Sequence, residues 1–312
     1  MKFERAIIIR DKTRLEQLIE RFNSKAQAKF YIEKSGGNFE YYEVENDTFY
    51  NSLSKVQYSI AKSLKYKTID RSFLPTYIFT EKDLIFVIGQ DGLVANTAKY
   101  INGLPIIGVN PDSERYDGVL LKYNPEDLSV VIKNVLNGKY KTSQITMAKA
   151  ALNDGQILLA FNDFYIGADS HVSSRYNIEF NGKRERQSSS GVLISTGAGS
   201  TGWLSSVFNM VNNINGQYSN KKTEYNKRLN WDDDLLVFVV REPFASKTSE
   251  RSLGYGLITK NRTLKIESNM PTRGVIFSDG IESDFLNFNA GSVVEIGIAD
   301  EKASLIISNS KI

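Results

Sequence analysis

The sequence predicts two domains, an N-terminal α/β domain over residues 1–145 and a mainly antiparallel β domain over residues 146–312. A chain of 312 residues is long for one hydrophobic core and fits two domains of ordinary size. In the first half, short apolar runs alternate with segments of helical period, as in a parallel sheet covered by helices. In the second half, short β-rich runs follow one another with turns between them.

The first domain opens on an apolar run at residues 6–9 that fits a buried strand. Thr13 and Glu16 then have the spacing of a capping box, which closes the first turn of a helix. A second helix is predicted by apolar residues at helical spacing, with Asp47 as its N-terminal cap: Phe49, Leu53, Val56 and Ile60. Two further buried strands are expected at residues 84–88 and 105–109, with a helix between them at 94–101.

A last helix of this domain is predicted after Asn124-Pro125, where proline at the first turn favours initiation and Gly138 ends the helix. Beyond it the β-rich runs lie at residues 157–161, 176–180, 192–195, 235–240 and 293–298. Asn181-Gly182 is a strong signal for a two-residue hairpin turn. One helix is expected in this half, near residues 202–211.

Composition excludes several kinds of chemistry. There is no cysteine, so thiolate catalysis and cysteine-based zinc sites are ruled out, and the single histidine, His171, rules out a multi-histidine metal site. A net charge of +3, spread along the chain, does not indicate a nucleic-acid partner. No apolar run approaches the length of a membrane span, and the first residues do not resemble a signal peptide, so we expect a cytoplasmic protein.

The first cluster of functional interest is Gly89-Gln90-Asp91-Gly92, at the end of a buried strand and the start of a helix. Ligands of open α/β sheets bind at this edge, and a helix N-terminus there presents free N–H groups to phosphate. Glycine lets the backbone approach a ligand closely. The alternative is a simple strand-to-helix turn in which Asp91 caps the helix.

Asn162-Asp163 is the second cluster, a polar pair between apolar residues. An amide beside a carboxylate suits the recognition of sugar hydroxyls, and a hairpin turn is the alternative. The third cluster, at residues 195–203, is rich in glycine and hydroxyl groups and ends in Trp203. Its glycines match G-x-G-x-x-G, but no strand–helix–strand unit opens here, so the dinucleotide fingerprint of that motif does not apply. His171 and the aspartates at 232–234 are interpreted as loop residues.

In this order the clusters resemble the motifs of the NAD kinases. That family has a Gly-Gly-Asp-Gly loop, an Asn-Glu pair, a Thr-Pro-Thr-Gly-Ser-Thr-Ala-Tyr loop and a late Asp-Gly. Here the matching segments are Gly89 to Gly92, Asn162-Asp163, residues 196–203 and Asp279-Gly280. Ser-Ser-Arg at 173–175, Ser-Ser-Ser-Gly at 188–191 and Trp203 look most like the mitochondrial-type branch.

The resemblance implies an N-terminal Rossmann-like domain and a C-terminal β domain that bind NAD together with ATP and Mg²⁺. Asp91 would be the catalytic base for the ribose 2′-hydroxyl. Gly89 and Gly92 would lie against phosphates, and Asn162 and Asp163 would hold a ribose. The base pocket would be lined by Thr201, Trp203 and Ser206. Members of the family are usually dimers or tetramers, so the resemblance also implies a homodimer or homotetramer.

Three functions are consistent with these residues. An active NAD kinase is favoured by Asp91, Asn162 and Thr201. A dinucleotide-binding or regulatory protein without catalysis is favoured by Gln90 and Leu93, which replace a glycine and a threonine of the family pattern. A lipid or sugar kinase of the same superfamily would share the glycine-rich loop, but the second and third clusters match the NAD branch. Asp163 itself stands where the family has glutamate.

Overall fold

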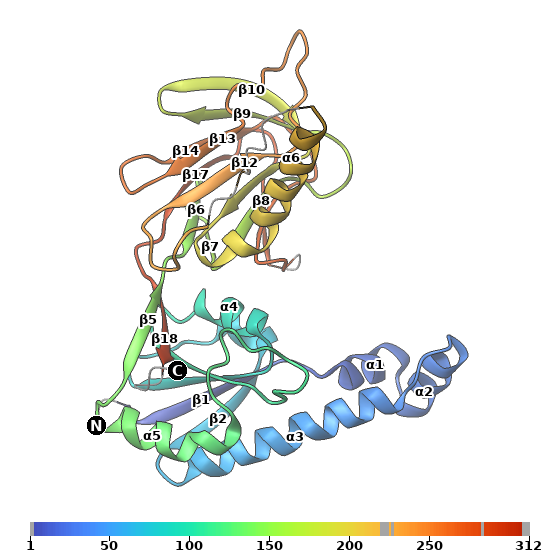
Figure 1. The fold of residues 1–312 in the computed structure, drawn as a ribbon, viewed down its shortest axis with the longest axis vertical. Coiled ribbons are helices and arrows are strands. Elements are labelled where there is room, and N and C mark those ends of the chain that lie inside the picture. The colour runs from blue at the N-terminus through green and yellow to red at the C-terminus, as the bar shows by residue number, and fades with distance from the viewer. Residues whose placement is uncertain (1–2, 219–224, 226–227, 282–283, 308–312) are drawn as a thin grey trace. The chain divides into compact units, whose positions relative to one another are not determined.

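The computed structural model describes residues 3–218, 225, 228–281 and 284–307, and the chain forms two compact units (Figure 1). The first unit comprises Met1–Ser143 with Ser304–Ile312, and the second comprises Gln144–Ala303. The sequence predicts a single boundary at residue 145, whereas the chain crosses between the units twice. The second crossing arises because the last strand pairs with a strand of the first unit.

The first unit is built on a six-stranded sheet. Its order is β2 (Lys65–Asp70), β1 (Arg5–Arg10), β3 (Asp83–Ile88), β4 (Pro105–Val109), β18 (Ala303–Ile307) and β5 (Lys141–Ile145). The pairs β1–β2, β1–β3, β3–β4 and β4–β18 are parallel. Strands β3 and β4 are buried along their whole length, as their apolar sequences predict. Strand β18 joins the sheet opposite Pro105 and Ile106.

Five α-helices of the first unit lie within its described residues: α1 (Arg14–Phe22), α2 (Lys25–Lys34), α3 (Glu40–Ala61), α4 (Asp91–Ala98) and α5 (Leu128–Leu136). The short 3₁₀ helices η1 (Arg71–Thr76) and η2 (Pro125–Asp127) precede β3 and α5. The capping box of Thr13 and Glu16 is present at the start of α1. The apolar stripe from Phe49 to Ile60 on α3 is buried in the core, as predicted.

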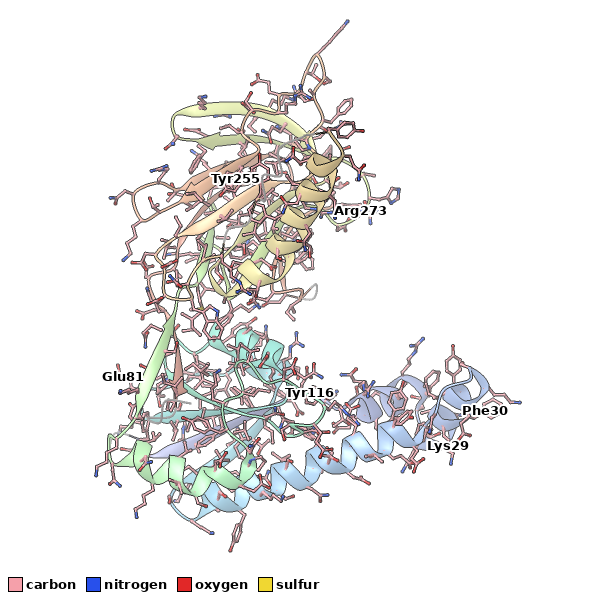
Figure 2. All side chains as sticks on the ribbon, viewed as in Figure 1. Lys29, Phe30, Glu81, Tyr116, Tyr255 and Arg273 are labelled. Carbon is pink, nitrogen blue, oxygen red and sulfur yellow. The ribbon has the colours of Figure 1, made fainter. Side chains whose placement is uncertain are left out.

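Helix α3 begins eight residues earlier than the sequence indicates, so Asp47 lies inside it and does not cap it. The additional turns pack on α1 and α2, where Leu15, Ala28 and Phe39 are buried in a separate small cluster. Helix α2 is not predicted from the sequence, because Ala28 is its only buried residue and it carries no apolar stripe. Figure 2 labels Lys29 and Phe30 on this helix, where Phe30 is exposed.

The second unit contains two six-stranded sheets. One has the order β10 (Lys183–Ser189), β9 (Ser174–Phe180), β14 (Leu264–Ser268), β17 (Val293–Ile298), β6 (Ala148–Leu152) and β7 (Ile157–Ala160). The other has the order β13 (Tyr255–Ile258), β12 (Leu236–Val240), β11 (Val192–Ser195), β8 (Asp163–Ala168), β15 (Gly274–Ser278) and β16 (Phe285–Asn287). Asn181 and Gly182, with φ of 55° and 74°, form the predicted hairpin turn between β9 and β10.

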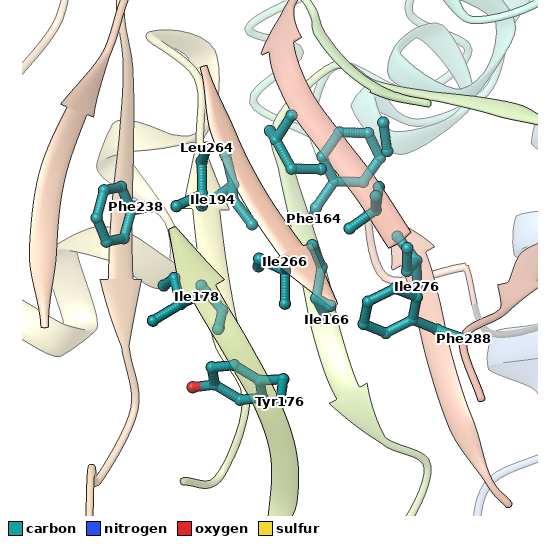
Figure 3. Packing of buried hydrophobic residues seen from close by; sticks show 14 of the residues in the cluster. Phe164, Ile166, Tyr176, Ile178, Ile194, Phe238, Leu264, Ile266, Ile276 and Phe288 are labelled. Carbon is teal, nitrogen blue, oxygen red and sulfur yellow. The ribbon is translucent and has the colours of Figure 1, made fainter. Parts of the chain in front are cut away.

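The core of the second unit lies between its two sheets. Figure 3 shows Phe164 and Ile166 of β8 and Ile194 of β11 packed with Ile178 and Ile266 of the other sheet. Because side chains alternate along a strand, Asp163 and Tyr165 of β8 point to the opposite face. The outer face of β11 and β12 packs against α6 (Trp203–Tyr218), the helix predicted for this half, through Leu193, Leu204 and Val237.

Among the described residues, no helix is long and apolar enough to cross a membrane.

Candidate functional site

The glycine-rich loop of the first unit follows strand β3 directly and leads into α4. The helix begins at Asp91, with Gln90 as the preceding cap residue, and no side chain hydrogen-bonds to its first turn. The N–H group of Leu93 donates to the Gln90 carbonyl at 2.9 Å, which leaves those of Asp91 and Gly92 available at the carboxyl edge of a parallel sheet. This is the arrangement that binds phosphate groups in open α/β folds.

Asp91 does not cap its own helix, which argues against the simple turn considered above. Its two carboxylate oxygens accept hydrogen bonds from the backbone N–H groups of Val119, at 2.9 Å, and Leu120, at 2.8 Å. These residues belong to the loop that follows β4. Each carboxylate oxygen has two lone pairs, so each retains an acceptor position after these bonds. Asp91 is therefore held in one orientation while it can still accept a bond from a hydroxyl group.

Gly92 and Gly89 differ in what surrounds them. A Cβ atom at Gly92 would meet nothing within 4 Å, whereas one at Gly89 would lie 3.1 Å from the Leu93 side chain. Packing within the protein thus gives no reason for glycine at 92, although glycine lowers the stability of a helix. Leu93 is buried beneath the loop, and Gln90 is exposed.

The first unit also has a cavity of about 720 Å³ between α3 and the loop after β4. None of the predicted site residues line it. Both of its cationic side chains are paired, Lys55 with Glu126 at 2.7 Å and Arg115 with Asp112 at 3.6 Å. The cavity therefore offers no unpaired cation to an anionic ligand.

In the second unit, Asn162 and Asp163 connect β7 to β8 and are fixed by Asp279. The Asp279 carboxylate accepts hydrogen bonds from the backbone N–H groups of Phe161, Asn162 and Asp163, at 3.0, 2.6 and 3.3 Å. Asp279 itself has a positive φ of 56°, and its N–H donates to the Asp163 carbonyl at 3.0 Å. The late Asp-Gly motif thus positions the Asn-Asp pair.

The side chain of Asp163 is half-buried on the outer face of β8. Burial and, to a smaller extent, the negative charge of the nearby Asp279 carboxylate together raise the pKa of Asp163 to about 7. Near neutral pH this carboxyl group therefore carries its proton part of the time. It can both donate a hydrogen bond to a sugar hydroxyl and accept one from it.

The third cluster packs directly on the Asn162-Asp163 segment. Thr196 donates its N–H to the Asn162 carbonyl at 2.9 Å and its hydroxyl to the Phe161 carbonyl at 2.6 Å. Gly199 lies against the same segment, because a Cβ there would be 2.2 Å from the Asn162 oxygen. The loop forms the 3₁₀ helix η3 (Ala198–Thr201) and then α6. The second and third clusters therefore form one structure.

Of the predicted residues of a base pocket, Thr201 ends η3, and Trp203 and Ser206 lie in the first turn of α6. Thr201 and Ser206 are exposed, and Trp203 is half-buried. The Trp203 ring is stacked on Tyr165 of β8, with centroids 6.0 Å apart and planes 9° apart. On its other side Tyr165 stacks on Phe277 of β15, at 5.0 Å and 29°. We call Trp203, Tyr165 and Phe277 the aromatic row.

Two glycines and one serine help to hold Tyr165 in this position. A Cβ at Gly191 or Gly167 would lie 2.6 Å from the tyrosine side chain, so both positions must be free of side chains. The Tyr165 hydroxyl donates to the Ala168 carbonyl at 2.9 Å, and the Ala168 N–H donates to the Ser174 hydroxyl at 2.8 Å. Ser174 and Gly191 belong to the Ser-Ser-Arg and Ser-Ser-Ser-Gly segments, which therefore support the aromatic row.

A cavity of about 470 Å³ lies beside the aromatic row. Arg241, immediately after β12, lines it, and its guanidinium carbon is 5.1 Å from the Trp203 centroid and 6.0 Å from the Tyr165 centroid. Nothing in the sequence alone singled out Tyr165, Phe277 or Arg241. They come together only through strand pairing, since β8 lies between β11 and β15.

Other residues considered in the sequence do not join this site. His171 is exposed in the turn before β9. Asp234 forms ion pairs with Lys260 and Lys302, and the hydrogen bond from Lys260, followed by that from Lys302, lowers the pKa of Asp234 to about 2. Within the described ranges, no group of three or more His, Asp or Glu side chains is placed to hold a metal ion.

Comparison with known proteins gives one consistent result. No protein-family model matches the chain. The NAD kinase of Saccharolobus islandicus is 24% identical over 159 residues, which cover 51% of this chain and 57% of that protein. The NAD kinase of Chlorobaculum tepidum is 24% identical over 124 residues, 39% of this chain and 43% of that protein. The chain thus matches about half the length of these curated relatives.

Two solved structures have a similar fold over nearly the whole chain. An NAD kinase from Archaeoglobus fulgidus in complex with ATP has a TM-score of 0.56 and 13% identity, covering 98% of this chain and 94% of that one. Yeast NADH kinase complexed with NADH has a TM-score of 0.59 and 12% identity, covering 98% and 84%.

The chain therefore has a two-unit fold like that of these solved NAD kinases, with an α/β first unit and a second unit of antiparallel sheets. Over about half of its length the chain is also similar in sequence to curated NAD kinases.

Proposed function

We propose that this protein is an NAD kinase that transfers the γ-phosphate of ATP to the 2′-hydroxyl of the adenosine ribose of NAD, giving NADP. The curated relatives are NAD kinases, and the two solved structures hold ATP and NADH. One observation within this chain carries the proposal furthest: Asp91 is held by two backbone N–H groups at the start of α4.

Asp91 is proposed as the group that orients or deprotonates the ribose hydroxyl. Phosphoryl transfer depends mainly on positioning and on stabilisation of charge, so a fixed carboxylate beside a phosphate-binding loop is sufficient machinery. Gly89 and Gly92 are proposed to lie against phosphate groups. The open space at Gly92 and the available N–H groups of Asp91 and Gly92 at the start of α4 support that role.

In the second unit, Asn162 and Asp163 are proposed to hold the NAD, at a ribose. The raised pKa of Asp163 supports this role, because a carboxyl group near its pKa both donates to and accepts from hydroxyl groups. Thr201, Trp203 and Ser206 are proposed to line the pocket for a base. Trp203 already stacks with Tyr165, so a planar ring finds an ordered aromatic surface.

Mg²⁺ is expected with ATP, but the described part of the chain provides no cluster of carboxylates or histidines that fits it. Magnesium in nucleotide-dependent enzymes is held largely by phosphates and water. The roles proposed for Asp91, Gly89 and Gly92 therefore require no metal ligand from the protein.

The finer assignments also remain proposals. Ser174 and Gly191, which support Tyr165, favour the mitochondrial-type branch. A homodimer or homotetramer and a cytoplasmic location are expected from the family and the sequence. Light scattering of the purified protein would measure its oligomeric state.

A second candidate function is dinucleotide binding without phosphoryl transfer. Gln90 and Leu93 favour it, because they replace the glycine and the threonine of the family loop. In this chain Gln90 is the cap residue of α4 and makes no capping hydrogen bond. A sharp rise of activity in Gln90→Gly would show that this position limits the kinase.

The two candidates are separated by incubating the purified protein with NAD, ATP and Mg²⁺ and detecting NADP with an NADP-specific dehydrogenase. Formation of NADP supports the kinase. Absence of NADP together with a clear rise of melting temperature in NAD would support the binding protein, since a ligand stabilises the state that binds it. Absence of both would contradict both candidates.

A further inference from the structure

Arg241 is held rigidly at its backbone. It follows strand β12, its N–H donates to the Gly191 carbonyl at 2.9 Å, and its own carbonyl accepts from the Ser190 N–H at 2.9 Å. Its guanidinium group lies over the rings of Trp203 and Tyr165. A stacked guanidinium keeps the N–H donors at its edge free to bind an anion.

The charge of Arg241 is poorly compensated within the described residues. The side chain is 28% exposed, and its only ion pair there is a 3.9 Å contact with the neighbouring Glu242, which is itself largely exposed. No hydrogen bond from the guanidinium to a described residue is present. Asp169, the other charged residue of the cavity, instead bonds to Arg273 at 2.7 Å.

The cavity combines three kinds of surface. The aromatic row provides flat apolar faces, and Arg241 provides an unneutralised cation with donors in a planar fork. Ser170 also lines the cavity, and its buried hydroxyl has no hydrogen-bond partner in the part of the chain described. A ligand that satisfies all three has a planar ring joined to an anionic group with several acceptor oxygens.

We infer that Arg241 binds a phosphate group of the dinucleotide and that one ring of the dinucleotide packs on the aromatic row. This assignment rests on the proposed function and adds to it a phosphate contact in the second unit. Bases stack on aromatic side chains with little regard to their identity. The specificity of the cavity for a nucleotide over a nucleoside therefore comes from Arg241.

The test uses the full-length protein and pairs of probes that differ only in one phosphate: AMP with adenosine, and nicotinamide mononucleotide with its riboside. In Arg241→Gln we expect at least one of the nucleotides to bind about 10–100-fold more weakly, the range for loss of a charged hydrogen bond. Binding of the matching nucleoside should change less than about two-fold. Arg241→Lys keeps the charge and should recover part of the loss.

The matched control is Arg262→Gln, which also removes a guanidinium that lies over a ring, that of Phe180, outside the cavity. It should bind all four probes as the parent does. Equal weakening of nucleotides and nucleosides by Arg241→Gln would show that Arg241 only shapes the aromatic surface. Unchanged binding of both nucleotides would also overturn the inference.

Failure of this inference differs from failure of the kinase. If the parent forms NADP and Arg241→Gln leaves the KM for NAD unchanged, the inference is wrong and the kinase stands. If Arg241→Gln selectively weakens a nucleotide and the parent forms no NADP, the inference stands without the kinase. If the parent protein binds none of the four probes and does not bind NAD, both the inference and the kinase proposal are contradicted.

Discussion

The two units carry their candidate residues in different ways. In the first unit Gly89, Asp91 and Gly92 are neighbours in the sequence, at the end of one buried strand. In the second unit the aromatic row and Arg241 come from β8, α6, β15 and the residue after β12. A site formed by one turn can be found from the sequence, whereas a site formed by strand pairing requires the structure.

The glycines of the two units differ in the same way. A Cβ at Gly199 would lie 2.2 Å from a backbone oxygen of Asn162, so the fold itself requires glycine there. A Cβ at Gly92 would meet nothing within 4 Å. Gly199 maintains the contact between two loops, whereas Gly92 leaves open space at the start of α4.

The largest effect on stability is expected from Gly199→Ala. The added methyl group would force apart the loop and the Asn162-Asp163 segment, which we expect to cost about 2–5 kcal/mol of unfolding free energy. Chemical denaturation followed by circular dichroism would measure it. Gly216→Ala in α6, where a Cβ meets nothing within 4 Å, is the matched control and should not destabilise the protein. A loss below about 0.5 kcal/mol in Gly199→Ala would contradict the packing role.

A smaller loss is expected from Asp279→Asn. The amide keeps one acceptor oxygen but removes the charge that three backbone N–H groups share, and we expect a loss of about 1–3 kcal/mol. Removing that charge should also lower the pKa of Asp163, because the Asp279 carboxylate raises it. NMR titration of Asp163 would follow this shift. An unchanged pKa would show that burial alone sets it.

The next effect depends on pH. Asp163 has a pKa of about 7 in the folded protein, above its ordinary value of 3.8, so its protonated form favours folding. The stability that it contributes is complete below about pH 4 and is lost as the pH rises through 7. At pH 8, Asp163→Asn should therefore be more stable than the parent by roughly 1–2 kcal/mol, less than the full shift implies because water screens a half-buried group.

Stability curves of both proteins measured between pH 4 and pH 8 test this prediction. The advantage of Asp163→Asn should shrink toward pH 4 and vanish there. A difference that stays constant with pH would show that Asp163 titrates normally.

The smallest change in stability is expected from Gly92→Ala, and its sign is opposite to that of Gly199→Ala. Alanine favours a helix more than glycine does, so the ligand-free protein should gain about 0.5–1 kcal/mol. If Gly92 approaches a phosphate group, the same variant should bind ATP or NAD more weakly than the parent. A variant that is more stable and binds both nucleotides normally would remove Gly92 from the site.

Much of the fold follows from local sequence signals. Strands β4 and β11 have the bounds that their apolar runs predict, and the capping box at Thr13 and the hairpin at Asn181-Gly182 are present. Three features do not follow. Helix α2 has too little buried surface to show a period, the start of α3 depends on packing with α1 and α2, and the pairing of β18 with β4 depends on tertiary contacts.

The candidate site divides in the same manner. The sequence allows two clusters to be recognised, Asn162-Asp163 and the loop at 196–203. It does not show that hydrogen bonds of Thr196 and Asp279 join them into one structure. Tyr165 looks like an ordinary strand residue in the sequence. Its role depends on Gly191 and Gly167, and Gly191 leaves space for its ring only after β11 has paired with β8.

The central claim is tested most directly by the rate of NADP formation in Asp91→Asn, compared with Asp117→Asn as a control. Asp117 is an exposed aspartate in the loop that Asp91 holds. We predict that Asp91→Asn lowers kcat by about 10²–10⁴-fold, the range for loss of a positioned base, and that Asp117→Asn stays near the parent rate. A rate within a few-fold of the parent in Asp91→Asn would contradict the assignment of Asp91 as the catalytic residue.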